Sequence, residues 1–421
     1  MSFSFAFDID AKELDDQLDL ASLTLSSTPD NARDDLALST SVLPHAEVPL
    51  SDLLATLPPL LSYTPVRVPV STSTGSSETV TLLRRDLFDA RFQILNQDES
   101  APAVYDKGKQ REAPTSDERE EAQFIDESSD LVKGVYEGGL KTWECSLDLV
   151  DCLAQRGYHP DHVGDDKVRG TSILEVGCGT AVPTCALFSR LLNEIERAPT
   201  PRGEQPKKRT RIHLQDYNDQ VLSLITLPNL LLTYARHVIL TRAAAVTASA
   251  PTPDADDEEA QQQESVAGLP RFEGPGELDV TPEFLEAFEE LLEREAIDLE
   301  FSHGDWSGMA ESVRRPVAAS GFDLVVTSET VYSLPSLAPL LDLLEAAAVN
   351  GEGNDHERRD HLCLVACKRI YFGVGGGELE FRRRVEERGG QVESVWGEGT
   401  GKGKSEGVGR TVLQVRWNDS K

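Results

Sequence analysis

Short apolar runs and longer amphipathic stretches alternate through the second half of the chain. The apolar runs that predict strands lie at 171–176, 211–217, 299–303, 322–327 and 361–368. The stretches between them, at 181–195, 220–240, 282–292 and 334–349, carry apolar residues at helical spacing and predict helices. The alternation predicts an α/β fold, in which helices cover both faces of a mostly parallel sheet.

Two details refine this prediction. The run 322–327 is apolar almost throughout, which is typical of a parallel strand covered on both faces. Two final strands, 391–396 and 411–417, flank a glycine-rich loop, and this arrangement indicates that one of the two is antiparallel. We therefore expect a Rossmann-like sheet of seven strands, mostly parallel, with one antiparallel strand.

An amphipathic helix is predicted just before the first of these strands. Trp143, Leu147, Val150 and Ala154 follow one another at i, i+4, i+7 and i+11, which places them on one helix face. Trp143 begins this apolar face, so packing alone would explain its presence.

Outside these elements the chain is mostly polar, and this contrast divides it into a compact domain and segments that we expect to be less ordered. We expect a mostly disordered acidic tail over 1–80, a partly ordered segment and linker over 81–128, and one compact domain over 129–421. Disordered insertions are expected at about 197–209 and 243–276. In the tail, three phenylalanines alternate, so a strand or anchor at 3–7 and a loose tail both remain open.

The charge of the chain limits the classes of partner that it can bind, and its cysteines bear on disulfide and metal binding. The chain holds 73 acidic and 41 basic residues, and its net charge of −32 opposes nucleic-acid binding and favours a basic protein partner. None of the six cysteines forms a CxxC pair, so we expect reduced thiols and no metal site. The N-terminus lacks a signal-peptide pattern, and we expect no membrane span.

A glycine-rich turn follows the first strand, in "ILEVGCGTAVPT" (173–184). A dinucleotide fingerprint needs a third glycine where Val182 stands, and a phosphate-binding loop needs a lysine that is absent. S-adenosylmethionine fits better, because Glu175 can bind its ammonium while Gly177 and Gly179 let the backbone approach it. Asp216, at the end of the next strand, can take the ribose hydroxyls. The alternative is a tight turn beside a satisfied acid.

Two more polar clusters follow strands, where ligands of open α/β sheets bind. In "HGDW" (303–306), Asp305 can accept the adenine amino group and Trp306 can cover the ring; alternatively Asp305 caps a turn and Trp306 is core. In "SETVY" (328–332), Glu329 and Tyr332 can turn towards one pocket; alternatively Glu329 caps a helix and Tyr332 is core.

Taken together, these segments resemble the histidine protein methyltransferases of eukaryotes. The segments that carry the resemblance are "YEGGLKTWECSLDLV" (136–150), "LEVGCGT" (174–180), "QDYN" (215–218), "TLPNL" (226–230), "GDW" (304–306), "SETVY" (328–332) and "IYFGVGGG" (370–377), with "SFSFAF" (2–7) and "RRDLFD" (84–89). The low-complexity insertions lie outside the resemblance.

The resemblance implies a class I methyltransferase that uses S-adenosylmethionine to methylate one histidine of a large-subunit ribosomal protein of the L-three type. It implies cytoplasmic and nuclear location, and we expect a monomer. The basic run 207–211 is either a nuclear import signal or a solvated loop. The cofactor site that we expect comprises Trp143, Glu144, Cys145, Ser146, Leu147, Glu175, Gly177, Cys178, Gly179, Gln215, Asp216, Tyr217, Gly304, Asp305, Trp306 and Ser328.

Histidine is a chemically plausible acceptor. With a pKa near 6.5, imidazole is mostly neutral at pH 7, whereas lysine is almost wholly protonated. The enzyme then mainly has to orient the ring, and we expect Glu329, with Tyr332, to accept the non-reacting N–H. Tyr371, Phe372 and Gly375 are expected to contact the substrate. A lysine methyltransferase of the same fold and an acidic, non-catalytic chaperone remain alternatives.

Overall fold

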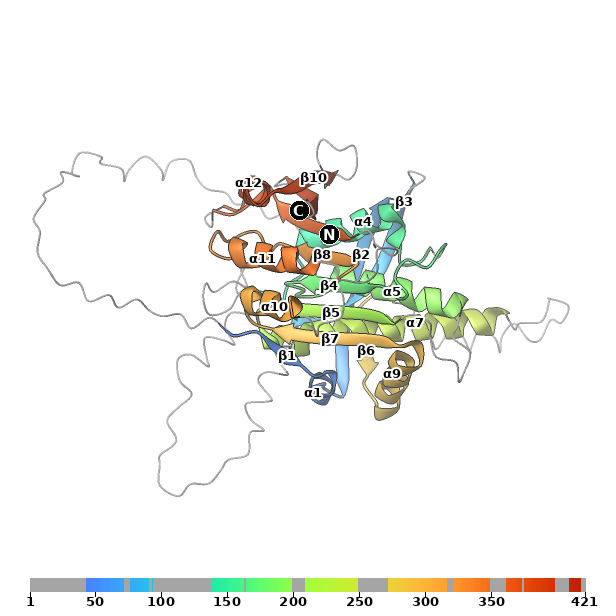
Figure 1. Cartoon of the computed structure of the whole chain (residues 1–421). Coiled ribbons are helices and arrows are strands. Elements are labelled where there is room, and N and C mark those ends of the chain that lie inside the picture. The colour runs from blue at the N-terminus through green and yellow to red at the C-terminus, as the bar shows by residue number, and fades with distance from the viewer. Residues whose placement is uncertain are drawn as a thin grey trace, which may run out of the picture. The chain divides into compact units, whose positions relative to one another are not determined.

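The central feature of the fold is an eight-stranded sheet (Figure 1). The computed structural model describes residues 43–71, 76–90, 93, 138–162, 164–198, 209–248, 272–315, 321–348, 361–372, 375–397 and 409–417. The strands lie in the order β1-β7-β5-β4-β8-β9-β11-β10. Their bounds are β1 Ala46–Val48, β4 Ser172–Val176, β5 Thr210–Asp216, β7 Ile297–His303, β8 Leu324–Ser328, β9 Leu362–Lys368, β10 Gly390–Gly397 and β11 Arg410–Trp417.

The predicted sheet is confirmed in its topology. Strands β7, β5, β4, β8 and β9 pair in parallel, and β11 lies antiparallel between β9 and β10. These seven strands form the mostly parallel sheet with one antiparallel strand that the sequence predicts. The eighth strand, β1, adds antiparallel to the edge of β7 and was not predicted.

Helices cover both faces of this sheet, and each face has its own apolar core. The helices are α4 Glu144–Leu153, α5 Val182–Arg197, α7 Leu227–Ala248, α9 Pro282–Glu295, α10 Trp306–Val313, α11 Leu337–Ala348 and α12 Glu378–Glu387. Side chains alternate along the buried strands: Leu324 and Val326 pack with α4, α5, α7 and α9, whereas Val325 packs with α10, α11 and α12. This double burial explains the continuous apolar run of β8.

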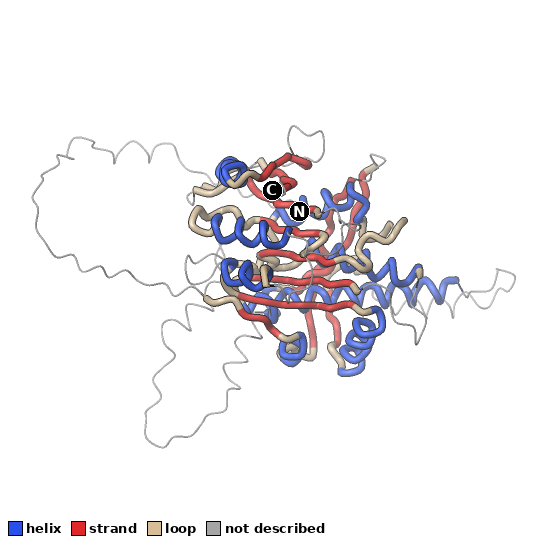
Figure 2. The backbone as a smooth tube through the Cα atoms, viewed as in Figure 1, coloured by secondary structure: helices blue, strands red, loops and turns tan. Residues whose placement is uncertain are grey.

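A second, three-stranded sheet corrects the prediction of a disordered segment over 1–80. Strands β2 Leu60–Ser71, β3 Ser77–Arg85 and β6 Gly276–Asp279 form it in the order β3-β2-β6, and the short helix α1 Leu50–Ala55 precedes it. The strands of both sheets are red in Figure 2. Two prolines hid β2 in the sequence. Pro65 and Pro69 pair only with β3, because β6 reaches no further than Tyr63, so each proline occupies an edge where no N–H is needed.

Parts of the two expected insertions are ordered as well. Helix α5 continues to Arg197, α7 continues to Ala248, and Phe272 is buried against the second sheet. The tail over 1–42 with its alternating phenylalanines, most of the linker (94–128), and the centres of both insertions (199–208 and 249–271) lie outside the described residues.

The second sheet is anchored by a buried arginine. The Arg85 side chain is fully buried, its backbone N–H donates to Asn229 Oδ1 at 2.8 Å, and its guanidinium pairs with Asp89 at 2.7 Å. Its Nη1 also donates to the Leu224 carbonyl at 2.8 Å. This carbonyl loses its usual helical donor because Pro228, four residues later, has no N–H. The arginine thus replaces the hydrogen bond that the proline removes.

The helix around Pro228 is irregular. A short α6 (Asp219–Val221) and a π-helical turn (Leu222–Thr226) lead into α7. The run Asp219–Ala243 is long and apolar enough to cross a membrane, but 67% of its most apolar window is buried inside the structure. Burial against the sheet and the second sheet therefore accounts for its apolar character.

Candidate functional site

The predicted site residues follow strands whose carboxyl ends meet at one edge of the sheet. Gly177 follows β4, Asp216 ends β5, Gly304 follows β7 and Ser328 ends β8. Hydrogen bonds join the first three of these ends, since Gly179 N donates to Asp216 Oδ2 at 2.9 Å and Gly304 N donates to the Asp216 carbonyl at 3.1 Å. The structure therefore brings together the segments that the sequence singled out.

The glycine turn adopts conformations that other residues rarely take. Gly177 and Gly179 have φ of 61° and 49°. A Cβ on Gly177 would lie 2.6 Å from a Thr330 methyl carbon, and one on Gly179 would lie 3.1 Å from the Gly139 carbonyl oxygen. Both positions require glycine for the packing of the chain itself. The segment at Gly139, which was expected only from the resemblance, lies directly against the turn.

Glu175 lies fully buried below this turn. Its Oε2 accepts from Thr184 N at 3.0 Å and from the Thr184 hydroxyl. Its Oε1 is buried and has no hydrogen-bond partner among the described residues. Burial raises the pKa of Glu175 to about 8, although the Thr184 hydrogen bonds work against the rise. A cationic ligand would compensate this carboxylate, which the chain leaves half satisfied.

Gln215 connects three segments of the site. Its Oε1 accepts from the Trp306 indole N–H at 2.8 Å, and its Nε2 donates to the Gly304 carbonyl at 2.9 Å. The neighbouring Asp216 uses both carboxylate oxygens on the chain, accepting from Gly179 N and from Asn218 N at 3.2 Å. Ribose binding by Asp216 stays a prediction, and what the structure assigns to this carboxylate is the support of the glycine turn.

A strap at 43–45 occupies the outer side of the β7 end. Leu43 N donates to the Tyr217 hydroxyl at 3.2 Å, and the Leu43 carbonyl accepts from Asp305 N at 2.9 Å. A Cβ on Gly304 would lie 2.3 Å from the Pro44 carbonyl oxygen. The strap thus provides a packing reason for Gly304 that is independent of any ligand.

The carboxylate of Asp305 caps the helix α10. This matches the alternative interpretation, in which Asp305 has a capping role and no ligand contact. Its Oδ2 accepts from Ser307 N and Gly308 N at the start of α10. An adenine contact by this carboxylate is therefore not needed to explain the residue. Trp306 is partly buried against the core beneath α10 and α11.

Glu329 does not cap a helix, which was the alternative interpretation of this residue. It follows β8 with φ of 60°, whereas the next helix, α11, begins eight residues later at Leu337. The Tyr371 hydroxyl donates to Glu329 Oε2 at 2.7 Å. Glu329 Oε1 is buried and accepts no hydrogen bond from the part of the chain that the structure describes. One oxygen is thus fixed, and the other remains able to accept.

Lys368 lies beside Glu329 and was not predicted from the sequence. It forms a cluster with Glu329, Glu144, Trp143 and Tyr371. Its Nζ lies 3.8 Å from Glu329 Oε1, 3.2 Å from Glu144 Oε2 and 5.0 Å from the Trp143 ring centroid. Burial works to lower the pKa of Lys368, but the charges of Glu329 and Glu144 raise it overall. Its place at the end of β9 is a signal in the sequence, but it does not by itself set Lys368 apart from other lysines that follow an apolar run.

Four further residues that were predicted to bind the cofactor, Cys145, Ser146, Leu147 and Cys178, make contacts within the chain itself. Cys145 is buried beside Glu329, and burial followed by the Glu329 charge raises the pKa of its thiol. Leu147 packs on the cluster beneath the β2–β3 hairpin, and Ser146 Oγ donates to the Trp143 carbonyl. Cys178 is buried under the glycine turn. Leu147 therefore has a purely structural explanation.

Residues expected to contact substrate divide into two groups. Tyr371 turns inward to Glu329, and its ring meets that of Tyr332 edge-on at 6.4 Å. Phe372 is 79% exposed, and Gly375, at φ of 81°, lies beside Leu334. Tyr371 therefore orients Glu329, while Phe372 and Gly375 remain available at the surface.

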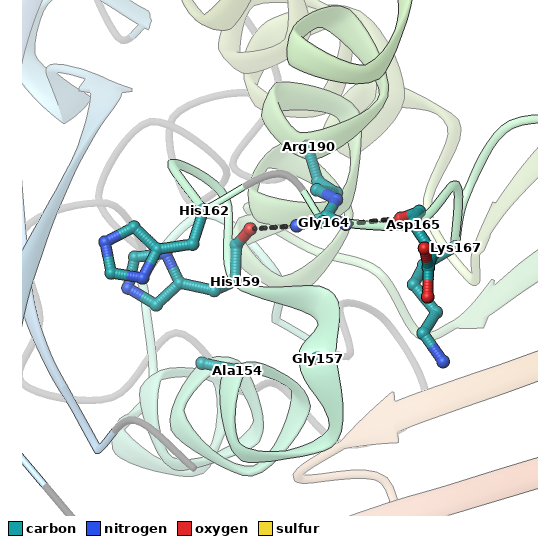
Figure 3. Close-up of a pocket in the computed structure, with 8 residues that line it drawn as sticks. All are labelled: Ala154, Gly157, His159, His162, Gly164, Asp165, Lys167 and Arg190. Carbon is teal, nitrogen blue, oxygen red and sulfur yellow. Dashed lines mark hydrogen bonds between the residues drawn. The ribbon is translucent and has the colours of Figure 1, made fainter. Parts of the chain in front are cut away.

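A second polar cluster lies between Arg190 of α5 and the loop that contains His159 and His162 (Figure 3). His159 and His162 stack at 4.1 Å, and Glu78 Oε2 lies 3.0 Å from His162 Nε2 and 3.7 Å from His159 Nε2. A metal would need the His159 Nε2 lone pair, yet His159 Nδ1 accepts from Asp161 N, which leaves the proton of a neutral ring on Nε2. We therefore interpret these three residues as a structural contact between the loop that contains His159 and His162 and Glu78 of β3.

Comparison with known proteins gives a consistent group of relatives. The chain is 32% identical over 329 residues to "Histidine protein methyltransferase 1" of Schizosaccharomyces pombe, covering 78% of this chain and 75% of the relative. It is 30% identical over 314 residues to the Saccharomyces cerevisiae protein of the same name, covering 73% and 69%. A Bos taurus homologue is 28% identical over 262 residues, covering 62% and 51%. No protein-family model matches the chain.

Two solved structures that the chain matches at low similarity are named as methyltransferases. One is a glycopeptide N-methyltransferase complexed with S-adenosyl-L-methionine, at 10% identity and a TM-score of 0.28, covering 68% of this chain and 100% of that one. Another is magnesium protoporphyrin IX methyltransferase from Synechocystis with bound cofactor, at 9% identity and a TM-score of 0.26, covering 66% and 99%.

Proposed function

We propose a substrate from one premise: this chain belongs to the histidine protein methyltransferase family, and it methylates histidine with S-adenosylmethionine as the donor. The substrate that we propose is a basic protein of the large ribosomal subunit, of the L-three type. The net charge of −32 supports a basic partner, because opposite charges speed the encounter of two proteins. We further propose that the enzyme acts as a monomer in the cytoplasm and nucleus.

The residues at the glycine turn fit the donor. Glu175 carries a buried oxygen without a partner in the described part of the chain, which suits the donor's ammonium group. The backbone at Gly177 and Gly179 carries no side chain where the turn is tightest. Asp216 and Trp143 are the further residues that we expect to hold it. The bound donor supplies a methyl group on a positively charged sulfur.

The geometry around Glu329 supports an imidazole acceptor. Histidine needs no deprotonation at pH 7, so catalysis rests on fixing the ring and its tautomer. Tyr371 fixes Glu329 Oε2, and Oε1 can accept the N–H of the non-reacting ring nitrogen. This contact directs the lone pair of the other nitrogen to the methyl group and stabilises the imidazolium that forms. The observation that carries the proposal of a histidine acceptor is the buried Glu329 Oε1, which accepts no hydrogen bond from the described residues.

One experiment tests the substrate. The purified chain is incubated with isotopically labelled S-adenosylmethionine and separated large-subunit proteins, and the labelled residue is identified by peptide fragmentation. The expected product is methylhistidine in one basic protein of the L-three type. Label on another basic protein would refute the substrate, label on lysine would refute the acceptor, and donor binding without any transfer would support a chaperone role instead.

A further inference from the structure

We propose that Lys368 is a positioning residue that places a positive charge beside Glu329 and leaves its Oε1 open to the substrate ring, and that Glu144 holds Lys368 at the required distance. This role deepens the proposed function and rests on it. Lys368 ends β9 and Glu329 follows β8, so neighbouring parallel strands present the two groups at the same edge of the sheet.

The distance between the two charges is informative. Lys368 Nζ lies 3.8 Å from Glu329 Oε1, which is close enough for attraction but too long for a hydrogen bond. The Lys368 and Glu329 side chains are only 20% and 10% exposed, so water screens this attraction weakly. The ammonium thus places a positive charge beside this carboxylate without occupying the oxygen that the substrate requires.

Two contacts hold Lys368 away from Glu329. Its Nζ lies 3.2 Å from Glu144 Oε2, and it stands 5.0 Å from the Trp143 ring centroid. The shorter ion pair and the aromatic face both draw the ammonium towards the start of α4. Tyr371 meanwhile holds the other Glu329 oxygen at 2.7 Å. The tyrosine therefore supplies the hydrogen bond and the lysine supplies the charge.

The charges in the cluster suit the reaction. Glu329 and Glu144 carry two negative charges against one on Lys368, and the nearby Asp148 is paired with Arg410. The other titratable neighbours are uncharged at neutral pH, because burial raises the pKa of Cys145, Cys367 and Tyr371.

One negative charge therefore remains uncompensated before the reaction. During transfer, a ring nitrogen forms a bond to the methyl carbon while the carbon–sulfur bond breaks and its electron pair stays on sulfur. The positive charge moves to the imidazole, where the uncompensated charge of the cluster neutralises it, and the ring then loses its N–H proton to solvent.

The test compares the pH dependence of kcat for methylhistidine formation. In Lys368→Met, Glu329 and Glu144 lose the cation that lies near both of them, so the repulsion between these two carboxylates is no longer offset. We expect kcat at pH 7 to fall about tenfold or more and the acidic limb of the profile to move up by about one pH unit. The double variant Lys368→Met/Glu144→Gln removes the second carboxylate, and we expect it to return the limb towards that of the wild type.

Two further variants separate charge from folding. Lys368→Arg keeps the charge, and we expect its acidic limb to stay in place even where kcat falls. Arg388→Met is the matched control, because Arg388 also pairs with two carboxylates, Asp342 at 2.7 Å and Glu345 at 3.3 Å, outside the site. We expect its profile to be unchanged.

The outcomes distinguish this role from the function on which it rests. If wild-type enzyme forms methylhistidine but the Lys368→Met profile drops by the same factor at every pH, the positioning role is overturned and the function stands. A Lys368→Arg limb that moves up by about one pH unit from that of the wild type overturns it too, and this comparison needs no folded methionine variant. Wild-type enzyme that forms no methylhistidine contradicts both.

Discussion

The Tyr371 hydroxyl lies 2.7 Å from Glu329 Oε2 and joins two neighbouring strand ends. The same hydroxyl accepts from Lys368 N at 3.2 Å, so it is oriented by the end of β9. Glu329 itself has a left-handed φ of 60°, which is uncommon for a residue with a side chain. Strain of this kind concentrates at functional positions, and here it accompanies a carboxylate that is fixed through one oxygen.

The first prediction concerns Glu329. Glu329→Gln keeps the size of the side chain but removes its charge, so the imidazolium that forms in the reaction loses its counter-charge. We expect kcat to fall about 100-fold or more. The dissociation constant of the donor should stay within about threefold, since the change lies in the acceptor half of the site. Turnover assays and calorimetry measure the two quantities, and an equal loss in both would exclude the role assigned to Glu329.

A second prediction follows from the raised pKa of Glu175. This carboxyl is protonated at pH 6.5, because burial raises its pKa to about 8. A bound ammonium favours the carboxylate, so donor binding should release about one proton. Calorimetric titration at pH 6.5 in two buffers of different ionisation enthalpy measures this release. A binding enthalpy that is the same in both buffers would show that Glu175 does not meet the cation.

The same group links stability to pH. Folded Glu175 keeps its proton up to about pH 8, whereas a carboxyl of ordinary pKa, 4.5, loses it much earlier. The folded state therefore binds more protons between these values, and the stability of the ligand-free protein should fall as pH rises across them. In Glu175→Gln this part of the fall should be absent. Chemical denaturation of both proteins at pH 5.5 and 8 provides the comparison.

A third prediction separates donor binding from chemistry at Asp216. Asp216→Ala removes the acceptor for Gly179 N and Asn218 N, so the glycine turn loses support. We expect the dissociation constant of the donor to rise about tenfold or more, with a much smaller change in kcat at saturating donor. Asp298→Ala, which breaks an exposed ion pair with Arg209 at the opposite end of the sheet, should leave both unchanged. An unaltered donor affinity in Asp216→Ala would remove Asp216 from the cofactor site.

The central sheet was predictable because its signal is local. Each buried strand of the parallel sheet is a short apolar run, and the polar residue that ends it marks the edge where ligands bind. Glu175 and Glu329 could be selected on this basis alone. Lys368 also ends such a strand, but a lone lysine after an apolar run is ordinary, and only the three-dimensional structure shows the two carboxylates that surround it.

The second sheet was not predictable because its signals conflict. Pro65 and Pro69 interrupt an otherwise alternating strand, and only the short partner β6 makes them acceptable at an edge. Asp305 illustrates a different limit, since an acid before an apolar run predicts a helix cap and a ligand contact equally well. Its hydrogen bonds to Ser307 N and Gly308 N favour the cap.

The last prediction concerns the reason for the glycine at 304. Gly304 has φ of 92°, and a Cβ there would lie 2.3 Å from the Pro44 carbonyl oxygen. Gly304→Ala must therefore displace the strap, which leads directly into β1, and we expect the free energy of unfolding to fall by about 2–4 kcal/mol, measured as a lower Tm. Gly164→Ala is the control, because nothing lies within 4 Å of its Cβ position.

Hydrogen exchange should locate the damage of Gly304→Ala. If the strap explains the glycine, exchange in Ala46–Val48 rises strongly, because these residues pair with β7 just beside Gly304. If close approach of the donor explains it, Tm and strap protection should instead resemble those of Gly164→Ala while donor affinity collapses. A stable, protected Gly304→Ala protein would therefore refute the packing explanation, because a Cβ cannot occupy the space of a carbonyl oxygen without moving the strap.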